Sequence, residues 1–192
     1  MGKKRDFIQQ FFKEKKTVGA ISPSSKFLAK KMMENINFDD SKVIVELGAG
    51  TGVFTRKLLR NLPNDGKLFV FELHKPFYKK LANEFKNDER IVLINDNAEK
   101  IRVYLQEYNY DYADVILSSL PLANFKKELV LEILKNSYLS LKNDGLYVQF
   151  QYSLKSKKRL FEIFDEVDLT FTPRNIPPAF VYTCKKNKPK NE

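Results

Sequence analysis

VIVELGAGTGVF, at residues 43–54, is a run of strand-forming residues that passes through three alternate glycines into a helical pattern. Glycines permit positive φ and let the backbone approach a ligand with no Cβ in the way, and a following helix presents free N–H groups. We therefore expect a buried strand that carries Glu46, followed by a ligand-binding loop over Gly48, Gly50 and Gly52.

The spacing of these glycines differs from that of two common phosphate-binding loops. A dinucleotide fingerprint, G-x-G-x-x-G, requires its third glycine at position 53, which is Val53 in this chain. A Walker-type loop requires Gly-Lys-Ser/Thr, and none follows here. The pattern that remains is E-x-G-x-G-x-G, which begins at the end of a strand.

The rest of the chain alternates short β-rich runs with longer amphipathic runs, as repeated βαβ units do. Turn residues at 64–66 and 143–145, both Asn-Asp-Gly, separate some of these runs. This alternation predicts an α/β fold with a largely parallel sheet. The predicted strands are residues 43–47, 68–73, 91–95, 114–118, 145–152 and 179–184. The predicted helices are residues 4–16, 24–35, 53–62, 76–86, 98–108 and 125–141.

Length and composition fit one folded unit, since the chain has 192 residues of which 43% are hydrophobic. No apolar run approaches the roughly 20 residues that span a bilayer, and the N-terminus lacks the features of a secretory signal. We therefore expect a cytoplasmic protein. The single cysteine, Cys184, has no second thiol or histidine cluster beside it, so neither an internal disulfide nor a metal site is expected. We assign residues 1–36 to an N-terminal helical lid and residues 37–192 to the main domain.

The net charge of +10 is concentrated at the two ends of the chain. Such an excess favours a polyanionic partner, and nucleic acid and an anionic membrane surface both attract lysine. On a helix over residues 4–16, Phe7, Ile8, Phe11 and Phe12 share one face, as in helices that lie at a membrane interface. The same residues also suit an ordinary helix packed on the domain, and the charged ends also suit solvated tails.

The E-x-G-x-G-x-G pattern resembles the first motif of the class I S-adenosylmethionine-dependent methyltransferases. The resemblance implies a Rossmann-like sheet of seven strands, the last of them antiparallel, that binds S-adenosylmethionine and releases S-adenosylhomocysteine. Polar residues follow the next three strands, and ligands in open α/β sheets bind at the carboxyl ends of strands. The resemblance implies that Glu72 accepts the ribose hydroxyls and that Asp96 and Asn97 meet the adenine amine. The cofactor residues are then Glu46, Gly48, Gly50, Gly52, Glu72, Asp96, Asn97 and Ser118.

Three further segments resemble the bacterial soluble phospholipid N-methyltransferases. They are residues 11–32 (FFKEKKTVGAISPSSKFLAKKM), residues 118–121 (SSLP) and residues 174–182 (RNIPPAFVY). The resemblance covers nearly the entire chain. It implies methylation of the amine of phosphatidylethanolamine toward phosphatidylcholine, by a protein that binds peripherally to an anionic membrane. No protein partner is indicated.

Methyl transfer is an in-line displacement, so the protein chiefly orients the nucleophile. A lipid ammonium with a pKa of about 10 lacks its lone pair at neutral pH, which would cost about 4 kcal/mol. Desolvation lowers the pKa of an amine without a dedicated base. We expect the apolar walls of such a pocket to be Leu120, Pro121, Leu122 and Phe180.

Three residues are the catalytic candidates of this reaction pocket: Ser119, Pro121 and Tyr152. Tyr182 is a further candidate contact for the amine. The only histidine, His74, lies two residues after Glu72 on the ribose side, so we do not assign it as a general base. Arg174 suits either a lipid phosphate or the solvent.

Two other functions remain as alternatives. The adenine methyltransferases of ribosomal RNA share the core pattern, and the positive charge suits RNA. Those enzymes carry Asn or Asp with Pro and an aromatic residue after the fourth strand, whereas residues 118–122 here read SSLPL, with Phe125 nearby. They also append a C-terminal RNA-binding domain, and this sequence ends soon after its last predicted strand. The third hypothesis is a non-catalytic membrane- or RNA-binding module on the same fold.

Overall fold

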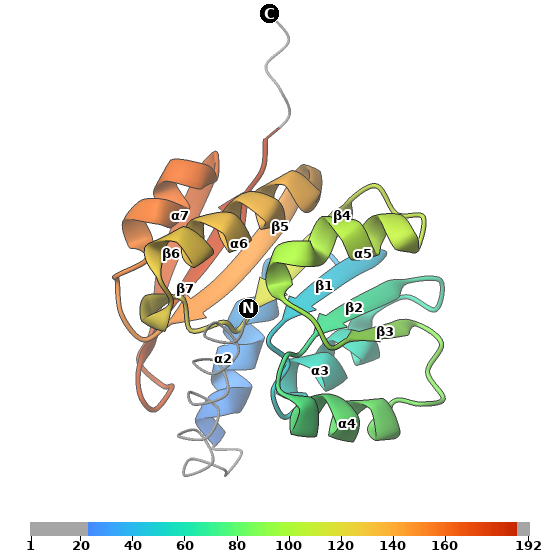
Figure 1. The fold of residues 1–192 in the computed structure, drawn as a ribbon. Coiled ribbons are helices and arrows are strands. Elements are labelled where there is room, and N and C mark those ends of the chain that lie inside the picture. The colour runs from blue at the N-terminus through green and yellow to red at the C-terminus, as the bar shows by residue number, and fades with distance from the viewer. Residues whose placement is uncertain (1–22, 188–192) are drawn as a thin grey trace, which may run out of the picture.

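Seven strands form one sheet in the order β3-β2-β1-β4-β5-β7-β6 (Figure 1). The computed structural model describes residues 23–187, with side chains from residue 26. β1 to β5 run parallel, and β7 runs antiparallel to both of its neighbours, β5 and β6. The strands are β1 (Val43–Leu47), β2 (Lys67–Phe71), β3 (Ile91–Ile94), β4 (Ala113–Ser118), β5 (Leu141–Gln151), β6 (Glu166–Thr172) and β7 (Ala179–Lys185). The predicted Rossmann-like α/β sheet with an antiparallel last strand is confirmed.

Helices cover both faces of the sheet (Figure 1). They are α2 (Pro23–Met33), α3 (Val53–Asn61), α4 (Lys75–Glu84), η2 (Ala98–Lys100), α5 (Ile101–Glu107), η3 (Leu122–Asn124), α6 (Lys127–Ser140) and α7 (Lys157–Ile163). One buried cluster joins α2, α3 and α4 to the sheet, and the other joins α5, α6 and α7 to it. This double covering explains the apolar sequences of the central strands, since a parallel sheet is buried on both faces. β1, at the centre, is buried at all five positions.

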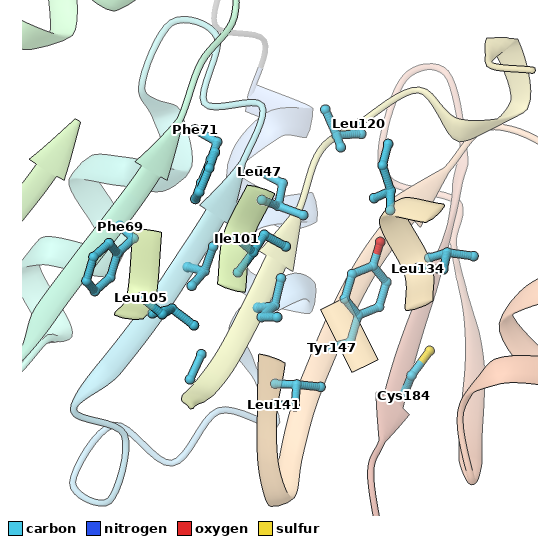
Figure 2. Packing of buried hydrophobic residues seen from close by; sticks show 14 of the residues in the cluster. Leu47, Phe69, Phe71, Ile101, Leu105, Leu120, Leu134, Leu141, Tyr147 and Cys184 are labelled. Carbon is cyan, nitrogen blue, oxygen red and sulfur yellow. The ribbon is translucent and has the colours of Figure 1, made fainter. Parts of the chain in front are cut away.

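The cluster under α5, α6 and α7 holds the large side chains of β1, β2 and β5 (Figure 2). The rings of Tyr147 and Phe164 stack with their centroids 4.9 Å apart. Cys184 lies on β7 inside the same cluster, and burial raises the pKa of its thiol. The cysteine is therefore an unreactive strand residue, as expected from its isolation in the sequence.

α2 is part of this folded body, because Leu28, Ala29 and Met32 are buried in the cluster that faces β1 and β7. The helix predicted over residues 4–16, including its apolar face, lies outside the described residues. The boundary of a lid at residue 36 therefore stays a prediction. Within residues 23–187, no helix is long and apolar enough to cross a membrane.

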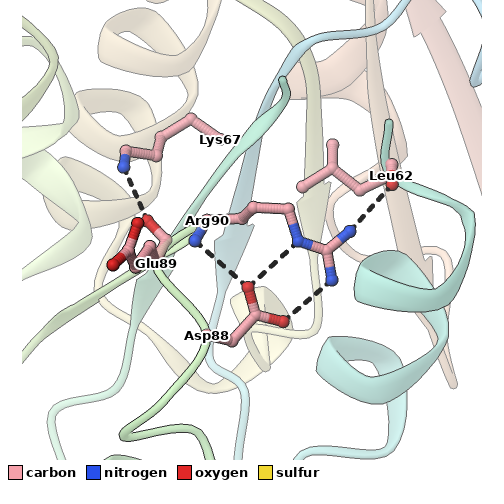
Figure 3. A network of polar contacts seen from close by, with 5 residues as sticks. All are labelled: Leu62, Lys67, Asp88, Glu89 and Arg90. Carbon is pink, nitrogen blue, oxygen red and sulfur yellow. Dashed lines mark hydrogen bonds and ion pairs between the residues drawn. The ribbon is translucent and has the colours of Figure 1, made fainter. Parts of the chain in front are cut away.

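A polar network closes the edge of the sheet where β2 and β3 begin (Figure 3). The Arg90 guanidinium donates to both carboxylate oxygens of Asp88, at 3.0 and 2.8 Å, and to the Leu62 carbonyl at 3.0 Å. The Arg90 side chain lowers the pKa of Asp88 through these hydrogen bonds. The Lys67 ammonium donates to the Glu89 carbonyl at 2.7 Å. The network ties two loops together at the edge opposite the carboxyl ends of the strands.

Candidate active site

The glycine loop adopts the backbone that its sequence predicts. Gly48, Gly50 and Gly52 have φ values of 79°, 56° and 82°, in the left-handed region that favours glycine. A Cβ on Gly48 would lie 3.0 Å from Cδ2 of Leu120, and a Cβ on Gly52 would lie 2.6 Å from Cδ2 of Leu81. The loop can therefore pass close to both leucines only because it has no side chains there.

Glu72 follows β2 and joins the end of that strand to the glycine loop. Its Oε2 accepts the Gly50 N–H at 2.6 Å, and its Oε1 accepts the His74 N–H at 2.7 Å. The side chain is buried. A buried carboxylate held by two backbone N–H groups is fixed in position, as a group that must meet a ligand's hydroxyls needs to be.

Glu46 lies behind the loop on β1 and is fully buried. The Thr55 hydroxyl donates to its Oε2 at 2.6 Å, whereas no described residue hydrogen-bonds to its Oε1. Burial raises the pKa of Glu46 to about 8, which the nearby charge of Glu72 supports and the Thr55 hydrogen bond opposes. A buried carboxyl oxygen with spare capacity to accept hydrogen bonds fits an amino-acid ammonium such as that of S-adenosylmethionine.

A first cavity opens beside the glycine loop at the carboxyl ends of β2 and β3. It brings together four of the predicted cofactor residues, Gly48, Glu72, Asp96 and Asn97. The remaining lining residues are mostly apolar and come from the end of β2, from loops, from η2 and from α6. They are Phe71, Leu73, Ala98, Glu99, Leu120, Phe125, Leu129 and Ile133.

The carboxylate of Asp96 is held by three donors. Lys100 lies 2.7 Å from Oδ2, the Tyr104 hydroxyl donates to Oδ2 at 3.0 Å, and the Asn97 N–H donates to Oδ1 at 2.8 Å. Burial alone would raise the pKa of Asp96, but these hydrogen bonds outweigh it and lower the pKa. Asp96 is thus an ionised acceptor at the edge of the first cavity.

A second cavity of about 220 Å³ lies at the carboxyl ends of β4 and β5. It brings together the three predicted catalytic residues, Ser119, Pro121 and Tyr152. Its other lining residues are Leu120, Ala123, Asn124, Phe150, Gln151 and Ser153. Leu120 lines both cavities, so they meet at this side chain.

Two buried glutamines hold the loop between the cavities, and sequence reasoning missed both. Nε2 of Gln149 and Nε2 of Gln151 donate to the carbonyl of Leu120 at 3.1 and 2.9 Å. The Ala123 N–H donates to Oε1 of Gln151 at 3.3 Å. Both glutamines lie on β5, about 30 residues after the loop, and their only sequence signal is an amide at a buried strand position.

Several predicted site residues do not line either cavity. Glu46 lies behind the glycine loop, Gly50 and Gly52 belong to the loop itself, and Ser118 is buried at the end of β4. Tyr182, Leu122 and Phe180 were expected around the amine and are also outside the lining. Phe150 and Ala123 are apolar residues of the second cavity's wall that were not predicted from the sequence.

Comparison with known proteins gives the family. Residues 2–162 match the ribosomal RNA adenine dimethylase family. An ornithine lipid N-methyltransferase from Singulisphaera acidiphila is 31% identical over 180 residues, which cover 93% of this chain and 94% of that protein. The ribosomal RNA small subunit methyltransferase A of Persephonella marina is 30% identical over 86 residues, or 45% of this chain and 32% of that protein.

Solved methyltransferases share the fold. The N-methyltransferase NodS from Bradyrhizobium japonicum, in complex with S-adenosylhomocysteine, has a TM-score of 0.71 at 13% identity, covering 94% of this chain and 98% of its own. These proteins are named as methyltransferases, which does not support the hypothesis of a non-catalytic module. The chain is an S-adenosylmethionine-dependent N-methyltransferase and belongs to the ribosomal RNA adenine dimethylase family.

Proposed function

We propose that this enzyme methylates the primary amine of a membrane-lipid head group, with phosphatidylethanolamine as the substrate predicted from the sequence. The observation that carries the proposal is the meeting of two cavities at Leu120. One contains Gly48 and Glu72, and the other contains Ser119 and Tyr152. A donor held in the first cavity and an amine held in the second would face each other across one side chain.

The first cavity fits S-adenosylmethionine, which when bound supplies an electrophilic methyl group. Glu72 would accept the ribose hydroxyls, and Asp96 and Asn97 would meet the adenine amine. The apolar residues of α6 and its preceding loop would cover the base. Glu46 offers its free carboxyl oxygen from behind the glycine loop.

The second cavity suits an amine that must lose its proton. All nine described residues that line it are uncharged, and the Ser119 hydroxyl is buried without a partner among the described residues. An ammonium there would have no carboxylate beside it, so desolvation would lower its pKa and favour the neutral, nucleophilic form. Ser119 Oγ would accept one N–H of that amine and so orient its lone pair.

A lipid substrate is supported by the ornithine lipid N-methyltransferase, which aligns with nearly the whole chain. Both phosphatidylethanolamine and ornithine lipid present a primary amine at a membrane surface. They differ in that one carries a phosphate next to the amine and the other carries none. The substrate test therefore includes both lipids.

The test is incubation of the full chain with methyl-labelled cofactor and vesicles of phosphatidylcholine and phosphatidylglycerol that contain phosphatidylethanolamine, ornithine lipid or neither. We expect label in an amine-bearing lipid and none in vesicles without one. Glu72→Ala is the matched control, because its weaker cofactor binding should lower the label in all vesicles alike. Label in unmodified ribosomal RNA alone would end the lipid proposal.

Adenine methylation in RNA is the second candidate. Asn124 brings an amide to the second cavity and Tyr152 brings a half-exposed aromatic ring, although neither occupies the sequence position typical of the RNA enzymes. An amide that accepts from the exocyclic amine and a ring that stacks on the base are the groups an adenine needs. The ribosomal RNA arm of the same assay decides between the candidates.

A further inference from the structure

We propose that the surface around the second cavity is a membrane-docking face whose partner is an anionic lipid bilayer. The docking face is formed by the start of α2, the segment after β5 and the loop between β6 and β7. The choice of a bilayer rests in part on the proposed lipid substrate. The residues of the docking face are Lys26, Phe27, Leu154, Lys155, Arg174 and Ile176.

These three segments form one continuous surface. β5 and β6 run in the same direction, so their carboxyl ends emerge at the same edge of the sheet as the start of β7 (Figure 1). The guanidinium of Arg174 lies over the ring of Phe27, 5.9 Å from its centroid, which joins the β6–β7 loop to α2. The Asn175 side chain opposes the rise in the pKa of Tyr152 that burial causes, so these two side chains lie close together and connect the same loop to the segment after β5. Tyr152 also lines the second cavity, so the docking face lies beside that cavity.

Large apolar side chains of this face lie in the solvent. Ile176 is 79% exposed, Phe27 is 47% exposed and Leu154 is 45% exposed. Ile176 and Leu154 are aliphatic residues in loops. Neither is buried in the domain core, so core packing does not explain why these two positions are apolar. Exposed aliphatic side chains suit insertion at the boundary between lipid head groups and acyl chains. A nucleic-acid-binding surface would instead present aromatic rings and hydrogen-bond donors.

The charge of the face complements an anionic surface. Residues 152–159 contain four cationic side chains and no carboxylate, and Arg174 adds another cation on the neighbouring loop. The acidic residues of the site lie around the first cavity instead, where Glu72, Asp96 and Glu99 line the wall. Cations near a leaflet of anionic lipids attract it, and interleaved apolar groups then insert. A lipid amine would thus reach the second cavity without the lipid leaving the bilayer.

The experiment measures the partition of the full chain onto phosphatidylglycerol–phosphatidylcholine vesicles by co-sedimentation. We expect the double variant Leu154→Ser/Ile176→Ser to partition about tenfold more weakly, because two apolar groups no longer insert. Lys155→Gln/Arg174→Gln should lower binding by about fivefold per charge on these vesicles and should weaken its salt dependence. Binding to phosphatidylcholine alone should not change with the charge variants.

The matched control is Val103→Ser/Leu139→Ser, which removes two side chains of similar exposure, 50% and 49%, from α5 and α6, two helices that contribute no residue to the docking face. It should bind vesicles as the unmodified chain does. Each variant should keep its melting-temperature shift with S-adenosylhomocysteine, which shows an intact fold and cofactor site.

The predicted N-terminal helix is a second candidate anchor, so every variant is also measured with Phe11→Asp. Unchanged partition of Leu154→Ser/Ile176→Ser in both backgrounds would overturn the docking face. Binding of ribosomal RNA that depends on Lys155 and Arg174, without vesicle binding, would overturn it as well. Intact vesicle binding without methylation of any lipid would instead refute the proposed substrate and leave the docking face standing.

Discussion

Replacing Glu46 by glutamine tests how burial controls the protonation of the carboxyl group behind the glycine loop. Glutamine has nearly the same shape and keeps an oxygen that can accept the Thr55 hydroxyl, while its NH₂ replaces the carboxyl oxygen that has no partner among the described residues. The substitution therefore removes the titration and little else. The free enzyme without cofactor is the relevant state.

The sign of the effect follows from the direction of the pKa change. Burial raises the pKa of Glu46 from 4.5 to about 8, so the folded protein binds more protons than the unfolded chain between these two values. Stability is therefore greatest below the unfolded pKa and decreases as the pH rises toward about 8. Ionisation of Glu46 lowers the free energy of unfolding by at most about 5 kcal/mol once the pH exceeds both pKa values. About 3 kcal/mol of this loss has already occurred at neutral pH.

Urea unfolding of the unmodified chain and of Glu46→Gln, measured between about pH 5 and pH 8, gives the comparison. We expect the two proteins to agree within about 1 kcal/mol at the acid end and the variant to be more stable by about 3 kcal/mol at neutral pH. Glu162→Gln, an exposed carboxylate on α7, is the control and should follow the unmodified chain. Parallel stability profiles for Glu46→Gln and the unmodified chain would refute the reasoning. If Glu46 also receives the cofactor's ammonium, the same variant should bind S-adenosylmethionine more weakly although it is more stable.

Three further predictions test the two cavities and the opposite edge of the sheet. Glu72→Ala should weaken S-adenosylmethionine binding by about 1.5 to 3 kcal/mol in calorimetry, because hydrogen bonds to a charged group are lost, and an unchanged dissociation constant would remove Glu72 from the site. Gln151→Leu should lower kcat/KM for the amine while the cofactor dissociation constant changes little, because Gln151 lines only the second cavity and Gln149 still holds the Leu120 carbonyl, and equal losses in both would contradict a role on the acceptor side. Arg90→Met should cost about 1 kcal/mol of stability in urea unfolding and leave cofactor binding unchanged, since its ion pair with Asp88 lies at the far edge and is half-buried.

Sequence patterns predicted the centre of the sheet better than its margin. The central strands are buried on both faces, so each reads as a mostly apolar run, such as VIVEL, in which Glu46 is the one charged residue. β6 was missed because it is an edge strand, where Glu166, Asp168 and Thr170 alternate with apolar residues over only seven positions. β5 begins at Leu141, ahead of the turn predicted over residues 143–145, because Leu141 already pairs with Ala113 of β4 and the register then shifts before Leu146 pairs with Val115. The existence of β6 and the start of β5 depend on pairing with neighbouring strands, and a local sequence pattern does not contain that information.

The candidate site likewise contains residues that could be predicted from the sequence and residues that could not. Residues at strand ends could be predicted, because the topology of a parallel sheet brings those ends together whatever the details of packing. The walls could not, because Leu129 and Ile133 of the first cavity read as ordinary core residues of an amphipathic helix. Gln149 and Gln151 were missed for a different reason. Their role depends on the carbonyl of Leu120, a backbone group whose position no side-chain pattern reports.

Leu120 links the two halves of the site physically. Its side chain lines both cavities and rests where a Cβ on Gly48 would intrude, and its carbonyl receives both buried glutamines. A change at Leu120 therefore disturbs cofactor and acceptor together. Asn124 and Tyr152, in contrast, line only the second cavity, so they can change without altering the glycine loop. This separation gives a physical reason why a chain that matches a family named for RNA methylation is also similar to a protein named for methylating a lipid.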